Sequence, residues 1–224
     1  MNADDVALYL KDNPGFFEEF SELLTQISVP NPHGGKAIAL SDRQVLALRD
    51  ENKALRAKMG ELIQFGEEND SIGDKMHRLS VALLQASDLA SVLATIHLNL
   101  RDDFAIPHTA LRIWRDGADS GDGGVVEFAA VSDRIQDYAA GLAEPFCGPS
   151  GNVEAAAWFG EAAPHVRSVA HIALLEPGPA GTPGPCYGLL ALGSEDVLRF
   201  YPDMGTLFLK RLGELASAAL VRAL

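Results

Sequence analysis

The stretch that decides the fold is LALRDENKALRAKMGELIQFGEENDSIGDKMHRLSVALL, residues 46–84. It contains no proline, is rich in charge, and carries apolar residues at alternating steps of three and four. Such a repeat predicts one long helix with a narrow apolar stripe, about two positions in seven. That stripe is narrower than the face of a helix lying on a globular core. We therefore expect a partner helix to cover it.

The stripe is a heptad pattern with one irregular step. Between Leu62 and Phe65 an extra step of three forms a stammer, which locally overwinds a coiled coil. Asn52 lies in the stripe, and in a parallel two-stranded coil such an Asn pairs with its twin. The alternative is that the helix folds back on its own chain. We expect a homodimer interface formed by Val45, Leu48, Asn52, Leu55, Met59, Leu62, Phe65, Asn69, Ile72, Met76, Leu79 and Leu83.

Composition limits the classes of function. The 224 residues are 47% hydrophobic, enough for a packed core, and the net charge is −13. Its lysines and arginines form no basic stripe of the kind that binds nucleic acid or an anionic membrane. The sequence shows no secretory signal and no run long enough to span a bilayer. We expect a cytoplasmic protein with no nucleic-acid or membrane partner.

The sequence also gives no support for a cofactor or a metal. The two cysteines, Cys147 and Cys186, lack metal-ligand spacing, and the six histidines are scattered. No phosphate-binding glycine motif is present. We expect no cofactor, no metal and no catalytic residues.

The chain is expected to have three parts. Residues 1–40 form a short helical pair and a linker rich in proline and glycine, residues 41–84 form the long helix, and residues 85–224 form a domain. In that domain the patterns predict helices at 87–104, 132–142 and 201–224, and strands at 108–117, 125–131, 165–176 and 186–194. This order is typical of an α+β fold with an antiparallel sheet, whose first and last helices share one face.

The end of this domain, YGLLALGSEDVLRFYPDMGTLFLKRLGELASAAL at 187–220, resembles a GAF domain, a small-molecule sensing fold related to PAS. The whole chain resembles the DUF484 family. That resemblance is carried by VALYLKDNPGFFEEF at 6–20, VPNPHGG at 29–35, LSDRQVLALRDEN at 40–52 and MGTLFLKRLGEL at 204–215. It implies a dimeric GAF-like domain behind a helical N-terminal extension, and no established activity.

In GAF domains the ligand lies between the sheet and the irregular lid segments. The resemblance therefore implies a candidate pocket lined by Arg112, Trp114, Arg134, Tyr138, Cys147, Trp158, Phe159, Arg167 and His171. A guanidinium beside aromatic rings can hold an anionic or planar ligand. The alternative is that the aromatic residues pack the core, the arginines pair with local acids, and His171 is a core histidine.

Three functions remain open. The first is a sensory or binding module that dimerises through the coiled coil and binds a small molecule or a protein. The second is a scaffold or interaction protein whose pocket is vestigial. The third is a thiol-dependent reductase of the free methionine sulfoxide type, which needs Cys147 and Cys186 within reach of each other. We expect the first and regard the protein as a non-enzyme.

Overall fold

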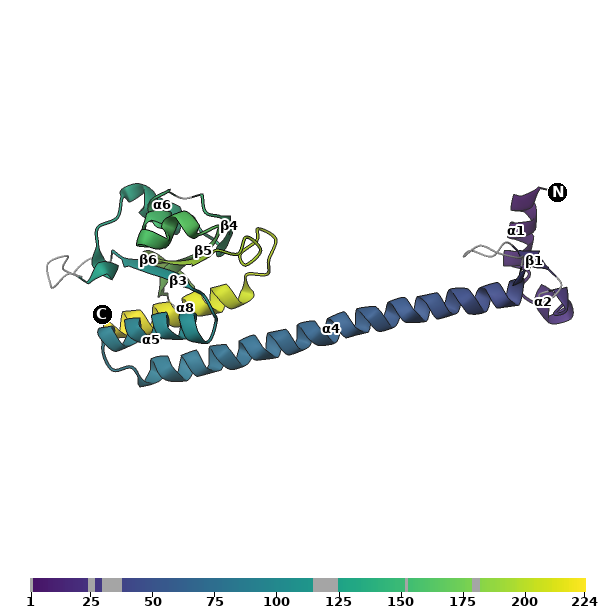
Figure 1. Cartoon of the computed structure of the whole chain (residues 1–224), viewed down its shortest axis with the longest axis horizontal. Coiled ribbons are helices and arrows are strands. Elements are labelled where there is room, and N and C mark those ends of the chain that lie inside the picture. Colours follow the sequence, from purple (N-terminus) through teal and green to yellow (C-terminus); the bar gives the residue numbers. More distant parts are fainter. Residues whose placement is uncertain (1, 24–26, 30–37, 115–124, 152, 179–181) are drawn as a thin grey trace. The chain divides into compact units, whose positions relative to one another are not determined.

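The computed structural model describes residues 2–23, 27–29, 38–114, 125–151, 153–178 and 182–224 (Figure 1). The chain divides into two compact units, residues 1–68 and 69–224, which are described separately below. One long helix, α4 (Leu40–Gln85), contributes to both units and confirms the helix predicted at 41–84. It runs without interruption through Gly60, Gly66 and Gly73.

The first unit contains two short helices, α1 (Ala3–Asp12) and α2 (Phe16–Glu19), as predicted for the N-terminal pair. A capping box starts α1: the backbone N–H of Asp5 donates to Asn2 Oδ1, and the backbone N–H of Asn2 donates to the Asp5 carboxylate, both at 2.8 Å. The two-residue strands β1 (Ser28–Val29) and β2 (Ile38–Ala39) pair antiparallel ahead of α4. Most of the predicted linker, residues 30–37, lies outside the described residues.

The second unit is an α+β domain built on a four-stranded antiparallel sheet. Its strands lie in the order β3-β6-β5-β4, so the two longest strands are central. This confirms the predicted α+β fold with an antiparallel sheet. After α4, the elements are α5 (Leu89–Asp102), β3 (His108–Ile113), η1 (Val126–Phe128), α6 (Asp133–Ala140), β4 (Phe146–Pro149), α7 (Val153–Ala157), η2 (Gly160–His165), β5 (Ser168–Pro177), β6 (Pro183–Ser194) and α8 (Leu207–Ala223).

Two local predictions in this domain were wrong. The strand expected at 125–131 contains the 3-10 turn η1 instead, because the amides of Phe128 and Ala129 bond locally to the carbonyls of Val125 and Val126. The segment around Cys147, expected to be turns, forms the edge strand β4 paired with β5. Four residues that include a glycine and a proline are too few to show a strand pattern.

Helices cover both faces of the sheet (Figure 1). The predicted arrangement, with α5 and α8 on one face, is confirmed, and α6 lies on the other face. Alternate residues of β6 follow this division: Leu190 and Leu192 pack with α8, whereas Leu189 packs with α6. Helix α8 approaches β5 closely at Gly213, where a Cβ would lie 2.5 Å from Ile172 Cγ2.

The last turns of α4 belong to the same core. Met76, Leu79 and Leu83 are buried in one cluster with α5 and α8, and Ile72 packs against it half-buried. These four residues form the C-terminal stripe of α4. Arg222 on α8 donates to the carbonyls of Leu83 and Ala86 at 2.7 and 2.9 Å, which ties α8 to the end of α4.

Among the described residues, no helix is long and apolar enough to cross a membrane.

The C-terminal stripe corrects part of the predicted dimer interface. Met76, Leu79 and Leu83 retain 8%, 0% and 3% of their exposure, so a second copy has almost no surface to contact there. The alternative weighed from the sequence, a helix that folds back on its own chain, holds for this segment. The physical reason is that residues of α5 and α8 pack over this part of α4 and bury it in the core of the second unit.

Candidate functional site

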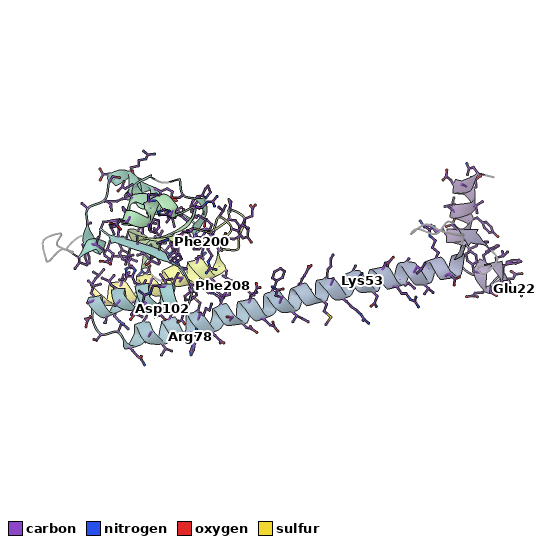
Figure 2. The ribbon with its side chains drawn as sticks, viewed as in Figure 1. Glu22, Lys53, Arg78, Asp102, Phe200 and Phe208 are labelled. Atoms are coloured by element: carbon purple, nitrogen blue, oxygen red, sulfur yellow. The ribbon has the colours of Figure 1, made fainter. Side chains whose placement is uncertain are left out.

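The first candidate site is the earlier part of the same helix. We call Val45, Leu48, Asn52, Leu55, Met59 and Leu62 the N-terminal stripe. Its five apolar members are 46–69% exposed, and Asn52 is also exposed. Along this part of α4 the side chains stand out from the ribbon, Lys53 among them (Figure 2). An exposed apolar row is a candidate interaction surface.

The N-terminal stripe has a defined surface. Val45, Leu48, Arg49, Asn52 and Arg56 line an open depression along the helix. Two further predicted interface residues, Phe65 and Asn69, are exposed as well, Phe65 to 57%. The surface therefore combines apolar residues in the middle with arginines on one flank, which suits a helical partner better than a small molecule.

The second candidate site, the predicted ligand pocket on the lid face of the sheet, contains a cluster of the protein's own buried side chains. Ile135, Ala139, Ala155 and Leu189 are at most 1% exposed and form its centre. The remaining members surround them, and they are Trp114, Val131, Tyr138, Leu142, Trp158 and Cys186. This packing matches the alternative in which the aromatic residues form a small core.

Arg112 points to the lid face, because its neighbours on β3, Leu111 and Ile113, are buried in the helix-face core. Its guanidinium lies over the ring of Trp158, 5.1 Å from the centroid, and Nη1 donates to the carbonyl of Leu111 at 2.8 Å. Burial lowers the pKa of Arg112, and the nearby Glu127 carboxylate partly opposes this effect. The stacked, hydrogen-bonded guanidinium has a structural role in holding Trp158 against β3.

His171 belongs to a buried polar pair. The Tyr138 hydroxyl lies 2.9 Å from His171 Nδ1, and the Phe146 ring stacks on the imidazole with centroids 5.7 Å apart. The histidine is 1% exposed, and burial lowers its pKa to about 4. Burial also raises the pKa of Tyr138. At neutral pH both groups are uncharged, which is the state of a satisfied core histidine.

The other predicted pocket residues are dispersed. Arg134 on α6 and Arg167 before β5 are exposed at the surface. Trp114 uses its indole N–H to donate to the Cys186 carbonyl at 3.3 Å, on the filled lid face. Phe159, in the segment between α7 and η2, lies near the start of β3, where its ring centroid is 6.4 Å from that of His108. Two pairs of the nine predicted residues are in direct contact: Arg112 lies over the ring of Trp158, and Tyr138 is within hydrogen-bonding distance of His171.

The two thiols lie on different faces of the sheet. Cys147 packs into the helix-face core, and Cys186 packs into the lid-face cluster. Both are free thiols; burial raises the pKa of Cys147 to about 11 and also raises that of Cys186. A reactive cysteine needs a lowered pKa and solvent access. The placement of Cys147 corrects its expected position in the pocket and disfavours thiol chemistry.

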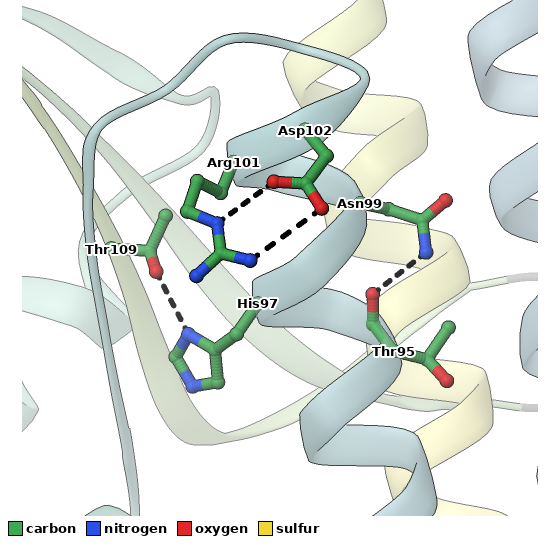
Figure 3. A network of polar contacts seen from close by, with 6 residues as sticks. All are labelled: Thr95, His97, Asn99, Arg101, Asp102 and Thr109. Atoms are coloured by element: carbon green, nitrogen blue, oxygen red, sulfur yellow. Dashed lines mark hydrogen bonds and ion pairs between the residues drawn. The ribbon is translucent and has the colours of Figure 1, made fainter.

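A third candidate site was predicted only in part, because two of its residues, Trp158 and Phe159, belong to the predicted pocket. A groove of about 300 Å³ lies beside β3, lined by His97, Leu98, Arg101, Pro107, His108, Thr109, Trp158 and Phe159. On its wall, His97 Nδ1 lies 2.8 Å from Thr109 Oγ1, and the neighbouring Arg101 binds Asp102 (Figure 3). His97 Nε2 lies 3.2 Å from Glu127. The groove is thus lined by two imidazoles, a guanidinium and the aromatic rings of Trp158 and Phe159.

His108 contributes a buried nitrogen to this region. Its Nε2 lies 3.5 Å from Glu195 Oε1, an ion-pair distance, yet it has no hydrogen-bond partner among the described residues. At 3.5 Å this contact is too long for a strong N–H···O bond. Because His108 also lines the groove, its Nε2 is a candidate contact for a ligand there.

Comparison with known proteins identifies the family. The family model described as protein of unknown function, DUF484, matches residues 1–222. The chain belongs to the DUF484 family. No curated protein matches it. Membership confirms the resemblance carried by the sequence, and because the family description assigns no function, the function must be argued from the geometry.

For this DUF484 protein, the groove shows what the sequence did not reveal. His97 and Arg101 are four residues apart on α5, a spacing that places them on one helix face. That spacing was the available signal. His108, Trp158 and Phe159 come to the same place only through the pairing of β3 with β6 and the path of the segment after β4, which no local pattern specifies.

Proposed function

We propose that this DUF484 protein is a non-catalytic interaction module that dimerises through the N-terminal stripe of α4. The observation that supports it is the row of five apolar residues, each at least 46% exposed, at heptad spacing on one helix. If left in water, such a row loses about 1.5–3 kcal/mol per side chain relative to full burial. A second copy of the same helix covers it with matching spacing.

We further propose that the second unit is a GAF-like domain acting as a scaffold. In support, the domain has an antiparallel sheet with its first and last helices on one face, the arrangement on which the resemblance to GAF rests. Ile135, Ala139, Ala155 and Leu189 are buried together on the lid face, the side on which GAF domains hold a ligand. This favours the scaffold over the small-molecule sensor. The two free thiols are consistent with a reducing cytoplasm.

The test removes the stripe without touching the second unit. Leu55→Asp with Leu62→Asp places four charges in the centre of the proposed dimer interface, and we expect monomers in analytical ultracentrifugation. The control variant, Ala57→Asp with Gln64→Asp, adds the same charges at the same spacing on another side of the helix, and should remain dimeric. A dimer in the first variant contradicts the proposal.

Small-ligand binding is a second candidate function, and the groove beside β3 is the observation that favours it. Its His97, His108 and Arg101 side chains can form hydrogen bonds with a small polar ligand. Native mass spectrometry of protein from cell extract would reveal a retained ligand. If a ligand is retained by wild type but not by His108→Ala, the groove binds it. A ligand that persists in His108→Ala, or protein that carries none, contradicts this second function.

A further inference from the structure

We infer that the two copies of α4 pair in parallel and in register, with Asn52 facing Asn52 of the second copy. The inference rests on the proposed function, because it specifies how the proposed dimer is built. Neither the family nor the exposure of the stripe fixes this orientation. The information lies in which residue types occupy each heptad position and in the charges that flank the stripe.

The heptad assignment of the N-terminal stripe is unambiguous. In a heptad, position d follows a by three residues and the next a follows d by four. Val45, Asn52 and Met59 therefore occupy a, and Leu48, Leu55 and Leu62 occupy d. Leucine at every d position, with a β-branched residue and one Asn at a, is the composition that favours two parallel strands.

Asn52 distinguishes the two orientations. In a parallel coil, a positions face a positions, so the two Asn52 amides meet and hydrogen-bond with each other. In an antiparallel coil, a faces d, and the register that aligns the whole stripe sets Asn52 opposite Leu55. An amide facing leucine in a dry interface lacks a partner and costs about 1–3 kcal/mol. Each antiparallel dimer would contain two such amides.

The flanking charges favour the same orientation. In a parallel coil, the residue that precedes an a position lies near the residue that follows the next d position on the partner helix. That rule pairs Glu51 with Arg56 of the second copy, twice per dimer, and Gln44 with Arg49. In an antiparallel coil, Arg49 of one copy lies near Arg56 of the other, also twice per dimer, and the two arginines repel each other. This repulsion offsets the attraction between Glu51 and Lys58 on the opposite flank of the stripe. All these charged side chains are exposed on α4 and available to a partner.

Disulfide crosslinking of the full chain tests the orientation. Val45→Cys is the first variant. In the parallel coil its two cysteines face each other, whereas in the antiparallel coil they are 17 residues apart along the helix, about 25 Å. The second sample mixes Val45→Cys with Leu62→Cys, two residues that face each other only in the antiparallel coil. Wild type, which retains Cys147 and Cys186, measures any background from the native thiols.

We expect mild oxidation to convert most of the Val45→Cys protein into a covalent dimer, with at least tenfold less mixed dimer in the second sample. A mixed Val45–Leu62 crosslink as the main product overturns the parallel orientation but leaves the proposed dimer intact. No crosslink in either sample, with a dimer still seen by ultracentrifugation, also overturns it. A monomer in ultracentrifugation overturns both the orientation and the proposed function.

Discussion

The two stripes of α4 have the same spacing and opposite surroundings. In the N-terminal stripe the apolar residues are 46–69% exposed, whereas in the C-terminal stripe Leu79 is fully buried by α5 and α8. Both sets repeat at three and four residues on a single uninterrupted helix. The comparison shows that heptad spacing predicts a covered stripe but does not say whether the cover comes from the same chain or another. Four predictions, from the largest expected effect to the smallest, test this difference.

The largest effect is expected in the C-terminal stripe. Leu79→Ala removes a fully buried side chain from the core and should lower the free energy of unfolding of the second unit by about 4 kcal/mol. Chemical denaturation measures it. Leu84→Ala on the same helix is the matched control, because Leu84 is 74% exposed and its loss should cost under about 0.5 kcal/mol. Equal losses in the two variants would mean that the C-terminal stripe is not part of the core.

The second effect concerns the pH dependence of the second unit. His171 is buried in its neutral form, and its pKa is lowered from 6.5 to about 4. The unfolded chain therefore binds a proton more readily between these values, and stability is complete above pH 6.5 and falls as the pH drops toward 4. The expected contribution is about 3 kcal/mol.

Acid titration of the unfolding free energy tests this, comparing wild type with His171→Gln. The variant should lose the slope between pH 6.5 and 4, whereas His77→Gln, at an exposed position on α4, should keep it. An unchanged slope in His171→Gln means that other groups cause the acid sensitivity. The N-terminal stripe contains no histidine, so the strength of dimerisation through it should change less between pH 6.5 and 4.

The third effect is expected in the N-terminal stripe. A core Asn fixes register at the cost of stability, so Asn52→Val should tighten the dimer about tenfold, or about 1.4 kcal/mol. It should also allow larger assemblies, because the polar layer no longer selects two strands. Sedimentation equilibrium over a range of concentrations measures both. Weaker association in Asn52→Val would show that Asn52 does not face its twin across an apolar interface.

The smallest effect is expected at the joint between α4 and α8. Arg222→Ala removes two hydrogen bonds to the carbonyls at the end of α4 and should cost about 1 kcal/mol in the unfolding of the second unit. Arg211→Ala on the same helix provides the control, since its guanidinium lies over the ring of Phe208 and makes no contact with α4 that we measured. A loss no larger than that of Arg211→Ala would remove Arg222 as a link between these helices.

The sequence was informative wherever a pattern repeats along one element. It predicted α4, α5, α8 and the strands β5 and β6. It failed where structure depends on segments far apart in the chain. Strand β4 exists because β5 supplies the partner, and η1 replaces a strand because its amides bond locally.

The candidate site follows the same division. Its aromatic and arginine residues could be recognised as a group, but the sequence does not say which face of the sheet each one occupies. Cys147 lies on the helix face because it is one residue after Phe146, whose ring stacks on His171 on the lid face. One step along a strand reverses the face, so an expected pocket residue becomes a core residue.

Sedimentation of the unmodified full-length chain tests the central claim most directly. If a second copy covers the N-terminal stripe, the protein at micromolar concentration should sediment with twice its 23.9 kDa chain mass. A single species of 23.9 kDa at the same concentration would contradict pairing through α4, and with it the orientation inferred from Asn52.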